Sequence, residues 1–269
     1  MRKLRKLRKF ILERSYLLRP RIYSYFFKIL NLYLKYPVRI RFVSGQIMIR
    51  DLNSDYIIFN SRPRRISRYG LGVKQLCDSL FEGYCVDGLN LPDNATIIDI
   101  GANVGEFSYS LIKKNSSLKL ISIEPDPSDF KDLERNIGVK HLAINRAVAD
   151  FNGELWIYLN NEFGDTGVFP TDNSASRFKA RCSTLDEIYA EHCFGEKIFL
   201  IKCEAEGFEP EVLSGASNTL KSTYYISCDT GPERMGQSTL SEVQSLLQKS
   251  NFKLIRSNRN RHLFMNLLT

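Results

Sequence analysis

The sequence predicts an α/β fold in which helices cover both faces of a mostly parallel β-sheet. Two observations carry the prediction. From about residue 95 onward, short apolar runs alternate with segments of helical character, which is typical of strands joined by helices. Helix start signals also stand between the runs. Such a sheet binds its ligands at the carboxyl ends of its strands, so the search for a site begins there.

The individual elements can be placed from local patterns. Asp126 precedes Pro127, which is a capping acid before a proline at the first helical position. Thr184 and Thr239 each open a capping box of the form S/T-x-x-E. The apolar runs predict strands at residues 97–100, 118–123, 141–148, 154–159, 197–203, 224–228, 252–256 and 263–267.

One long connection interrupts this alternation. Residues 160–181 are polar and rich in glycine, and loops of this length in a compact domain are often lids or substrate walls. A solvated surface loop is the simpler alternative. Three basic side chains in it are candidates for contact with an anionic acceptor: Arg177, Lys179 and Arg181.

The sequence before the alternating region has a different character. Residues 1–36 form a basic arm, and residues 37–94 contain a predicted hairpin around Ser44-Gly45 followed by a helix over residues 71–88. Residues 95–269 form the main domain. The chain is long enough for one large domain or two small ones.

The basic charge is concentrated in the arm. Residues 1–41 carry thirteen Lys or Arg and one acid, Glu13, a net of +12, so that residues 42–269 carry −4 of the formal total of +8. Apolar residues recur in the arm at helical spacing, at Leu4, Leu7, Ile11, Leu18, Ile22, Phe26, Ile29 and Tyr33. The apolar stretch 22–34 is interrupted by Lys28 and is too short to cross a bilayer, which takes about 20 residues.

Three interpretations of the arm stay open. A basic amphipathic helix can lie on an anionic membrane surface, here the inner face, and residues 1–36 are the candidate for such peripheral contact. It can equally cap the domain or contact a protein partner. Nucleic acid is disfavoured, because no recognised nucleic-acid-binding fold accompanies the arm.

The cysteines and histidines exclude other classes. The six cysteines show no C-x-x-C pair and several lie in apolar runs, which indicates reduced core cysteines and a cytoplasmic protein. The three histidines have no zinc-site spacing, so we expect no metal.

The segment "IIDIGANVGEFS", residues 97–108, predicts a ligand-binding turn. It contains the pattern D-x-G-x-x-x-G, with Asp99, Gly101 and Gly105, and lacks the second and third glycines of a dinucleotide fingerprint. This pattern suits S-adenosylmethionine, which has no pyrophosphate. The turn residues predicted to contact it are Asp99, Gly101, Ala102, Asn103, Gly105, Glu106 and Phe107.

Two further segments complete the predicted cofactor site. Glu124 ends the next strand, where its carboxylate can accept hydrogen bonds from both ribose hydroxyls. Ala147, Val148 and Asp150 end the third strand and would frame the adenine. In the simpler alternative, Asp99 and Glu124 only cap helices.

At this point the sequence resembles the FkbM family of S-adenosylmethionine-dependent methyltransferases, from about residue 69 to the end. The resemblance lies in the ordered segments "IIDIGANVGEFS", "ISIEPDP", "NRAVADFNGELWIY", "STLDEI", "FLIKCEAEGFEPEVLSGA", "SCDTGPER" and "HLFMNL". It implies a class I methyltransferase fold, which is Rossmann-like, with six parallel strands and one antiparallel strand. It also implies methyl transfer to oxygen, commonly on sugars, glycans or secondary metabolites.

The chain departs from the family in one respect. The family usually has I-D-V-E-G where this chain has C-E-A-E-G, so Glu204 replaces an aspartate at the end of the fourth strand. The extra methylene displaces the carboxylate, and a misplacement near 1 Å can cost on the order of 10²-fold in rate. This departure leaves room for a non-catalytic cofactor-binding module with a membrane- or nucleic-acid-binding arm.

Methyl transfer needs an acceptor oxygen held in line with the methyl group and relieved of its proton. Glu204 is the first candidate for orienting or deprotonating the acceptor, followed by Glu206 and Asp229, which ends the fifth strand. The alternatives are structural: Glu206 and Glu209 near a helix start, and Asp229 in a turn. His192 is a weaker candidate base, and Arg234 would contact substrate or a neighbouring carboxylate.

The predicted function is therefore S-adenosylmethionine-dependent O-methylation of a small molecule or glycan acceptor, including lipid-linked sugars. A nicotinamide-dependent oxidoreductase is the second enzyme hypothesis, and the missing glycines disfavour it.

Overall fold

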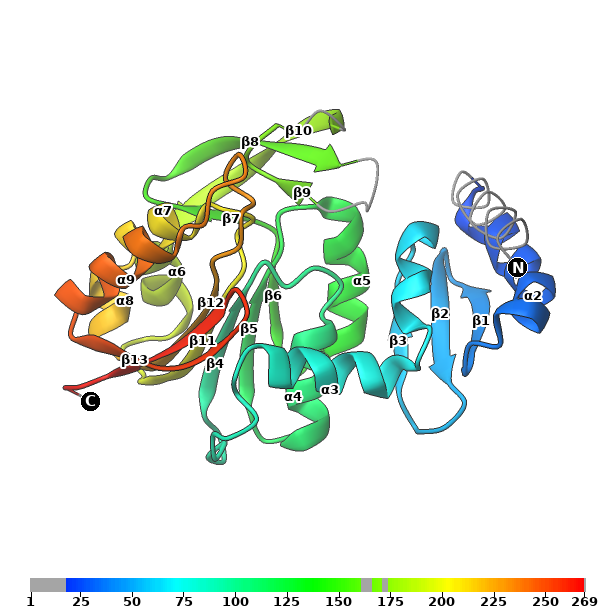
Figure 1. Cartoon of the computed structure of the whole chain (residues 1–269), viewed down its shortest axis with the longest axis horizontal. Helices are drawn as coiled ribbons and strands as arrows, with labels where there is room; N and C mark the ends of the chain where they lie inside the picture. Colours follow the sequence, from blue (N-terminus) through cyan, green and yellow to red (C-terminus); the bar gives the residue numbers. More distant parts are fainter. Residues whose placement is uncertain (1–17, 161–165, 171–173, 269) are drawn as a thin grey trace. The chain divides into compact units, whose positions relative to one another are not determined.

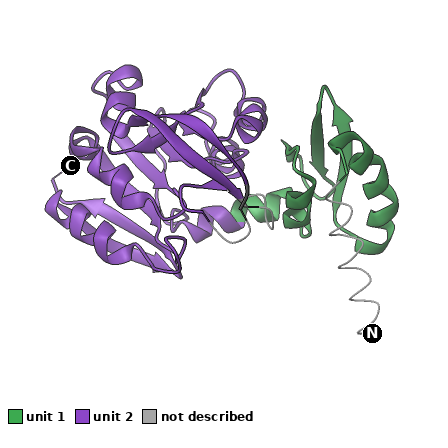
Figure 2. Cartoon of the chain, turned by 90° about the horizontal axis from the view of Figure 1, so that it is seen from above, with its two compact units in different colours: residues 1–78 green, residues 79–269 purple. Residues whose placement is uncertain are grey.

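The structure is a computed structural model that describes residues 18–160, 166–170 and 174–268. The chain divides into two compact units, Met1–Asp78 and Ser79–Thr269 (Figure 2). Within the described ranges, no helix has the length and apolar character needed to cross a membrane.

The first unit is built from a helix and a small antiparallel sheet. The helix α2 (Pro20–Leu34) packs on β1 (Val38–Val43) and β2 (Gln46–Asp51), to which β3 (Ile57–Phe59) adds a third strand. The predicted hairpin is confirmed. Its two turn residues, Ser44 and Gly45, both have positive φ, as the right-handed twist of a tight hairpin requires. A 3₁₀ helix, Pro63–Tyr69, follows, and α3 (Val73–Gly83) leads into the second unit. The predicted arm residues Leu4, Leu7 and Ile11 lie outside the described residues.

The core of the second unit is the predicted sheet, which has seven strands (Figure 1). The spatial order is β13-β14-β12-β11-β4-β5-β6. Only β14 runs against the others within this sheet, which confirms the expected six parallel strands and one antiparallel strand. The strands are β4 (Thr96–Ile100), β5 (Lys119–Ile123), β6 (Leu142–Ile144), β11 (Ile198–Cys203), β12 (Thr223–Asp229), β13 (Phe252–Asn258) and β14 (Arg261–Asn266).

Helices cover the sheet on both faces, as predicted. On one face, Ile98, Ile121 and Ile201 pack against side chains from α6 (Leu185–His192), α7 (Glu209–Ser214), α8 (Ser217–Lys221) and α9 (Leu240–Lys249). On the other face, Ile97 and Leu200 pack against α4 (Glu106–Lys114) and residues from the end of α3 onward. The remaining helix, α5 (Pro127–Ile137), contacts α4 and β6. Alternate residues of each strand therefore serve opposite faces.

A second, four-stranded sheet corrects two expectations. The predicted strand 141–148 is two strands, β6 in the large sheet and β7 (Ala147–Ala149) in the small one, whose order is β7-β10-β8-β9. Much of the predicted loop 160–181 is β10 (Ser174–Thr184), paired with β8 (Gly153–Asn160). The short β9 (Thr166–Gly167) forms the edge. The reason is a period-two pattern hidden in a polar segment: Phe178, Ala180 and Cys182 face a small core, while Arg177 and Lys179 are exposed.

The helix caps were predicted with mixed success. The Asp126 side chain accepts hydrogen bonds from the backbone of Ser128 and Asp129, and Thr184 accepts one from Glu187, as expected. The capping box at Thr239 is wrong. Its hydroxyl donates instead to Glu209 Oε2 at 3.1 Å, and the Ser238 hydroxyl accepts from the backbone N–H of Leu240. Thr239 is thereby linked to a carboxyl group of the candidate site.

Candidate active site

The glycine turn after β4 has three residues in the left-handed region of φ. Gly101, Asn103 and Gly105 have φ values of 67°, 54° and 89°. A Cβ atom on Gly101 would meet the backbone oxygen of Glu204 at 1.9 Å, and one on Gly105 would meet Leu133 Cδ1 at 2.7 Å. The glycines are therefore required by the close approach of neighbouring chain segments as well as by the turn. The first contact places the turn directly against the residue that follows β11.

Asp99 lies at the end of β4 and is fully buried. One carboxylate oxygen accepts a 2.7 Å hydrogen bond from the Ser108 hydroxyl, and the other lies 3.1 Å from Lys202 Nζ. Burial raises the pKa of Asp99, and the ammonium of Lys202 and the Ser108 hydroxyl offset part of that increase. The structure thus gives Asp99 protein partners beneath the turn, and its contact with a ligand stays a prediction.

Glu124 follows β5 and is 3% exposed. Its two oxygens accept hydrogen bonds from the backbone N–H groups of Asn103 and Asp126, at 2.8 and 2.9 Å. These two bonds fix the orientation of the carboxylate at the tip of β5. Its contact with the ribose hydroxyls of a cofactor stays a prediction.

The other predicted cofactor residues surround the same strand ends. Ala102 is buried in the turn, and Glu106 and Phe107 are buried at the start of α4, where the Phe107 ring packs edge-on against Tyr84 at 5.3 Å between centroids. Ala147 and Val148 are buried in β7, and Asp150 follows them in an exposed position. All of these contacts with a cofactor stay predictions.

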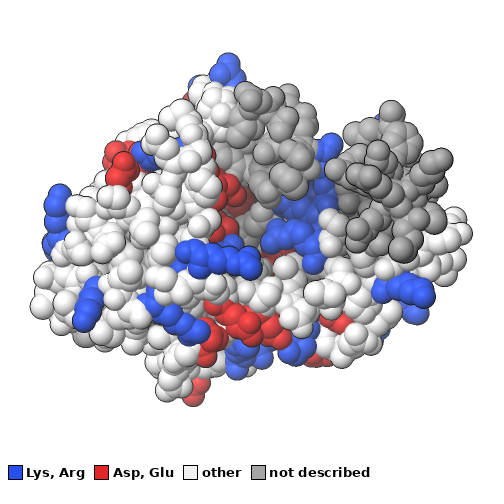
Figure 3. All heavy atoms as spheres, in the orientation of Figure 1, with Lys and Arg blue, Asp and Glu red and all other residues white. Residues whose placement is uncertain are grey.

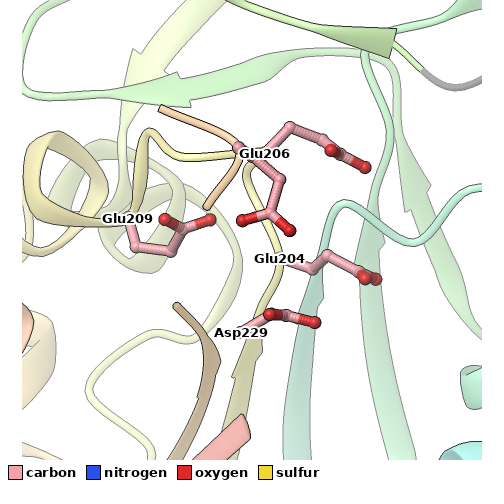
Figure 4. A pocket seen from close by; sticks show the side chains of 5 residues that line it. Glu204, Glu206, Glu209 and Asp229 are labelled. Carbon is pink, nitrogen blue, oxygen red and sulfur yellow. The ribbon is translucent and has the colours of Figure 1, made fainter. Parts of the chain in front are cut away.

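Five carboxyl groups line a pocket at the carboxyl ends of β11 and β12 (Figure 4). The pocket is shallow and partly open to solvent, with a cavity volume of about 10 Å³. The structure brings together here all three predicted catalytic residues, Glu204, Glu206 and Asp229. Glu209, which was interpreted as a helix-start residue, and Glu233, which was not singled out, complete the lining.

A row of alternating charges connects this pocket to the glycine turn. Lys202 Nζ lies 3.1 Å from Asp99 and 3.3 Å from Glu204, and Arg261 lies 3.4 Å from Glu204 and 2.8 Å from Asp229. The row therefore reads acid, base, acid, base, acid across β4, β11, β14 and β12. We call Asp99, Lys202, Glu204, Arg261 and Asp229 the charge row.

Lys202 is the residue of the charge row that touches the turn itself. Its side chain is 2% exposed, and its ammonium donates to the backbone oxygens of Ile100 at 3.0 Å and Gly101 at 2.8 Å. Burial lowers the pKa of Lys202, but Asp99 and Glu204 reverse this and raise it above its ordinary value. A permanently charged lysine thus connects the turn with the pocket.

Sequence reasoning missed Lys202, Arg261 and Tyr84. The Tyr84 ring lies under both cations, at 4.1 Å from the Arg261 guanidinium carbon and 5.3 Å from Lys202 Nζ. A lysine inside the apolar run "FLIKCE" was a readable signal, because a lysine is almost never fully buried unless it is paired. Arg261 and Tyr84 carry no comparable local signal.

Two pocket carboxyl groups have opposite protonation behaviour. Burial raises the pKa of Glu204, but Lys202 and Arg261 outweigh it and lower the pKa to about 2. For Glu209, which is 1% exposed, burial raises the pKa to about 7 although its oxygens accept hydrogen bonds from the backbone N–H groups of Ala205 and Gly207 and from Thr239. Glu204 is therefore ionised throughout the physiological range, whereas Glu209 titrates within it.

Arg234 and His192 have structural contacts. Arg234 donates to the backbone oxygen of Gly207 at 2.8 Å, pairs with Glu211, and lies 5.2 Å from the Phe169 ring centroid. Of its two predicted partners, the structure shows the neighbouring carboxylate. His192 ends α6 beside Glu191 and is not part of the pocket lining. Among the described residues, no group of three or more His, Cys, Asp or Glu side chains is arranged to hold a metal.

The strand order and the glycine turn define a class I methyltransferase. Residues 99–254 match the family model described as "Methyltransferase FkbM domain", which covers more than half of the chain. The chain therefore belongs to the FkbM methyltransferase family, and its cofactor is S-adenosylmethionine. The nicotinamide alternative is set aside.

Curated relatives carry methyltransferase names. The chain is 26% identical over 190 residues to methyltransferase sdnD of Sordaria araneosa, covering 56% of this chain and 73% of the relative. It is 25% identical over 208 residues to the 2-O-methyltransferase NoeI of Sinorhizobium fredii, covering 70% and 85%. A solved fibrillarin/Nop5p complex contains a similar chain, with a TM-score of 0.45, 11% identity and coverage of 84% and 95%.

Proposed function

We propose that the chain transfers a methyl group from S-adenosylmethionine to a hydroxyl oxygen of a sugar, a glycan, a lipid-linked sugar or a secondary metabolite. The observation that carries the proposal is the position of the carboxyl-lined pocket directly beside the glycine turn. The Lys202 ammonium donates a hydrogen bond to the backbone oxygen of Gly101 and forms an ion pair with Glu204 in the pocket. The backbone oxygen of Glu204 also lies next to the position that a Cβ atom on Gly101 would take. An acceptor whose hydroxyl reaches these carboxyl groups from the open side of the pocket would thus lie next to the donor.

The residues at the tips of β4 and β5 fit the cofactor. S-adenosylmethionine supplies an electrophilic methyl group on a sulfonium. Two backbone N–H groups orient the Glu124 carboxylate, which is the kind of group that accepts hydrogen bonds from ribose hydroxyls, and Gly101 and Gly105 leave the backbone of the turn without side chains at these two positions. Carboxylates near the sulfonium also favour a cation electrostatically.

Carboxylates in the pocket favour a hydroxyl acceptor, because an ionised carboxylate accepts the hydrogen bond that a hydroxyl donates. Glu204 is the first candidate for this contact. A group with a pKa of about 2 is a weak base, so Glu204 suits orientation of the hydroxyl better than complete removal of its proton. The name of NoeI, a 2-O-methyltransferase, supports oxygen as the acceptor atom.

The proposal is tested by incubating the full chain with methyl-labelled S-adenosylmethionine and a panel of fractionated glycans, lipid-linked sugars and metabolites. We expect label in a methyl ether. Glu204→Gln should lower the rate on the order of 10²-fold, since it loses the charged acceptor, and Glu204→Asp should retain more activity than Glu204→Gln.

Two outcomes would contradict the proposal. Label on nitrogen or carbon would exclude oxygen as the acceptor atom. The second outcome is cofactor binding without activity. If S-adenosylmethionine shifts the melting temperature but no member of a broad panel of hydroxyl compounds is labelled, the chain is a non-catalytic module.

A further inference from the structure

Helix α2 of the first unit has two apolar faces instead of one. Its inner face, Tyr23, Phe27, Leu30 and Leu34, is buried and packs on the small sheet. A second set recurs at helical spacing on the outside and consists of Ile22, Tyr25, Ile29, Leu32 and Tyr33, with exposed fractions from 53% to 80%. The outer face of a helix in a globular protein is usually charged or polar. We call these five residues the outer stripe.

The outer stripe concentrates exposed apolar area. It holds five of the sixteen large exposed hydrophobic side chains found in the described part of the chain, all within one helix. Scattered exposed hydrophobic residues are ordinary, but a contiguous patch marks an interaction surface. The inner face makes the packing on β1 and β2, so the outer stripe is not what holds α2 to the small sheet.

Basic side chains border the outer stripe. Arg21 and Lys28 are exposed and seven residues apart, so they lie on one edge of α2, and the exposed Lys35 follows directly after the helix as its C-cap. The sequence has no acid between Arg14 and Arg50. Lys28 Nζ lies 5.1 Å from the Tyr25 ring centroid, beside the stripe. In the view of Figure 3, the described surface over α2 shows uncharged and basic side chains.

We propose that the outer stripe binds the surface of an anionic lipid bilayer, with α2 lying in the plane of the interface. Apolar side chains would enter the boundary between headgroups and acyl chains, while the basic edge contacts lipid phosphates. Tyrosines such as Tyr25 and Tyr33 suit this boundary, because each has an apolar ring and a polar tip. This binding is independent of the proposed methyl transfer.

Charge decides against two other occupants. A second copy of the chain would bring two basic edges together around the stripe, where like charges repel. Nucleic acid matches the basic edge but gives the five apolar side chains nothing apolar to contact. An anionic bilayer satisfies both parts of the surface.

The test is co-sedimentation of the full chain with phosphatidylcholine vesicles, with and without phosphatidylglycerol. We expect binding that requires phosphatidylglycerol and weakens with added salt. The double variant I29E/L32E should lower the partition coefficient by about tenfold or more, and Lys28→Glu by about fivefold or more.

Leu71→Glu is the matched control, because Leu71 is 78% exposed and lies outside α2. It should bind vesicles like the unchanged chain. Unaltered circular dichroism and an unaltered melting shift with S-adenosylmethionine would show that each variant is folded.

Three results would overturn the proposal. The first is undiminished vesicle binding by I29E/L32E, and the second is an equal loss in Leu71→Glu. The third is a chain that does not bind vesicles. Light scattering would then show whether the chain is a dimer that I29E/L32E converts to a monomer. A binding assay with duplex nucleic acid would show whether the chain binds it and whether Lys28→Glu abolishes that binding.

Discussion

The two halves of the candidate site hold their carboxylates in different ways. At the tip of β5, Glu124 is oriented by two backbone N–H groups. At the tip of β11, Glu204 is oriented by two cationic side chains, Lys202 and Arg261, that come from β11 and β14. The donor half thus depends on the path of the backbone, and the acceptor half on long-range ion pairs.

This difference has a physical consequence. Exchanging a side chain leaves the backbone N–H groups in place, so these contacts of Glu124 depend on the path of the turn and not on one neighbouring side chain. Each acceptor-half contact depends on one side chain, and removing Lys202 leaves the buried carboxylate of Asp99 without its cation. Lys202 belongs to both halves, because it also donates to the backbone oxygens of the turn.

Removal of Lys202 should have the largest effect. Lys202→Met leaves Asp99 and Glu204 without their shared cation, and Asp99 is fully buried. We expect the free energy of unfolding to fall by about 3–5 kcal/mol, measured by denaturant titration. Lys119→Met removes an exposed pair with Glu196 and should cost less than about 1 kcal/mol. An equal loss of unfolding free energy in Lys202→Met and Lys119→Met would show that the buried ion pairs of Lys202 contribute no more than an exposed one.

Glu209 is a buried carboxyl group that accepts hydrogen bonds from backbone N–H groups and a hydroxyl, whereas Glu204 is held by cations. Burial raises its pKa to about 7, so between about pH 4.5 and 7 the folded state holds a proton that the unfolded state has released. Stability should therefore fall as the pH rises through this window, by up to about 3 kcal/mol, and level off above it. Glu209→Gln should remove this fall, as measured by denaturant titration across pH. An identical pH dependence in both proteins would show that Glu209 does not titrate there.

The glycine turn offers a smaller, well-controlled test. Gly101 and Gly138 both have positive φ, but a Cβ at Gly101 would meet the Glu204 oxygen at 1.9 Å, whereas at Gly138 nothing lies within 4 Å. Gly138 has φ 73° and ψ 170°, a region occupied almost only by glycine, so Gly138→Ala should cost about 1–3 kcal/mol from backbone strain alone. Gly101→Ala should cost more and also weaken S-adenosylmethionine binding, measured by calorimetry. Unchanged S-adenosylmethionine binding in Gly101→Ala would show that the turn does not contact the cofactor.

The same comparison explains what sequence reasoning reached. Asp99, Gly101 and Glu124 lie in short local motifs that the sequence shows directly. Glu204, Glu206 and Asp229 could be grouped because the carboxyl ends of parallel strands lie at the same edge of a sheet. Tertiary packing alone brings Arg261 into the charge row and places the Tyr84 ring against its two cations, so no local pattern reveals either residue. β10 was missed because its polar, glycine-rich surroundings masked a period-two pattern.

The central claim is that the donor lies at the Glu124 half and the acceptor at the Glu204 half. Calorimetry of S-adenosylmethionine binding to Glu124→Gln and Glu204→Gln tests it most directly. We predict that Glu124→Gln weakens binding by about tenfold or more, from lost hydrogen bonds to a charged group, while Glu204→Gln changes it by less than about threefold. Equal weakening in both variants, or a larger effect in Glu204→Gln, would contradict the account.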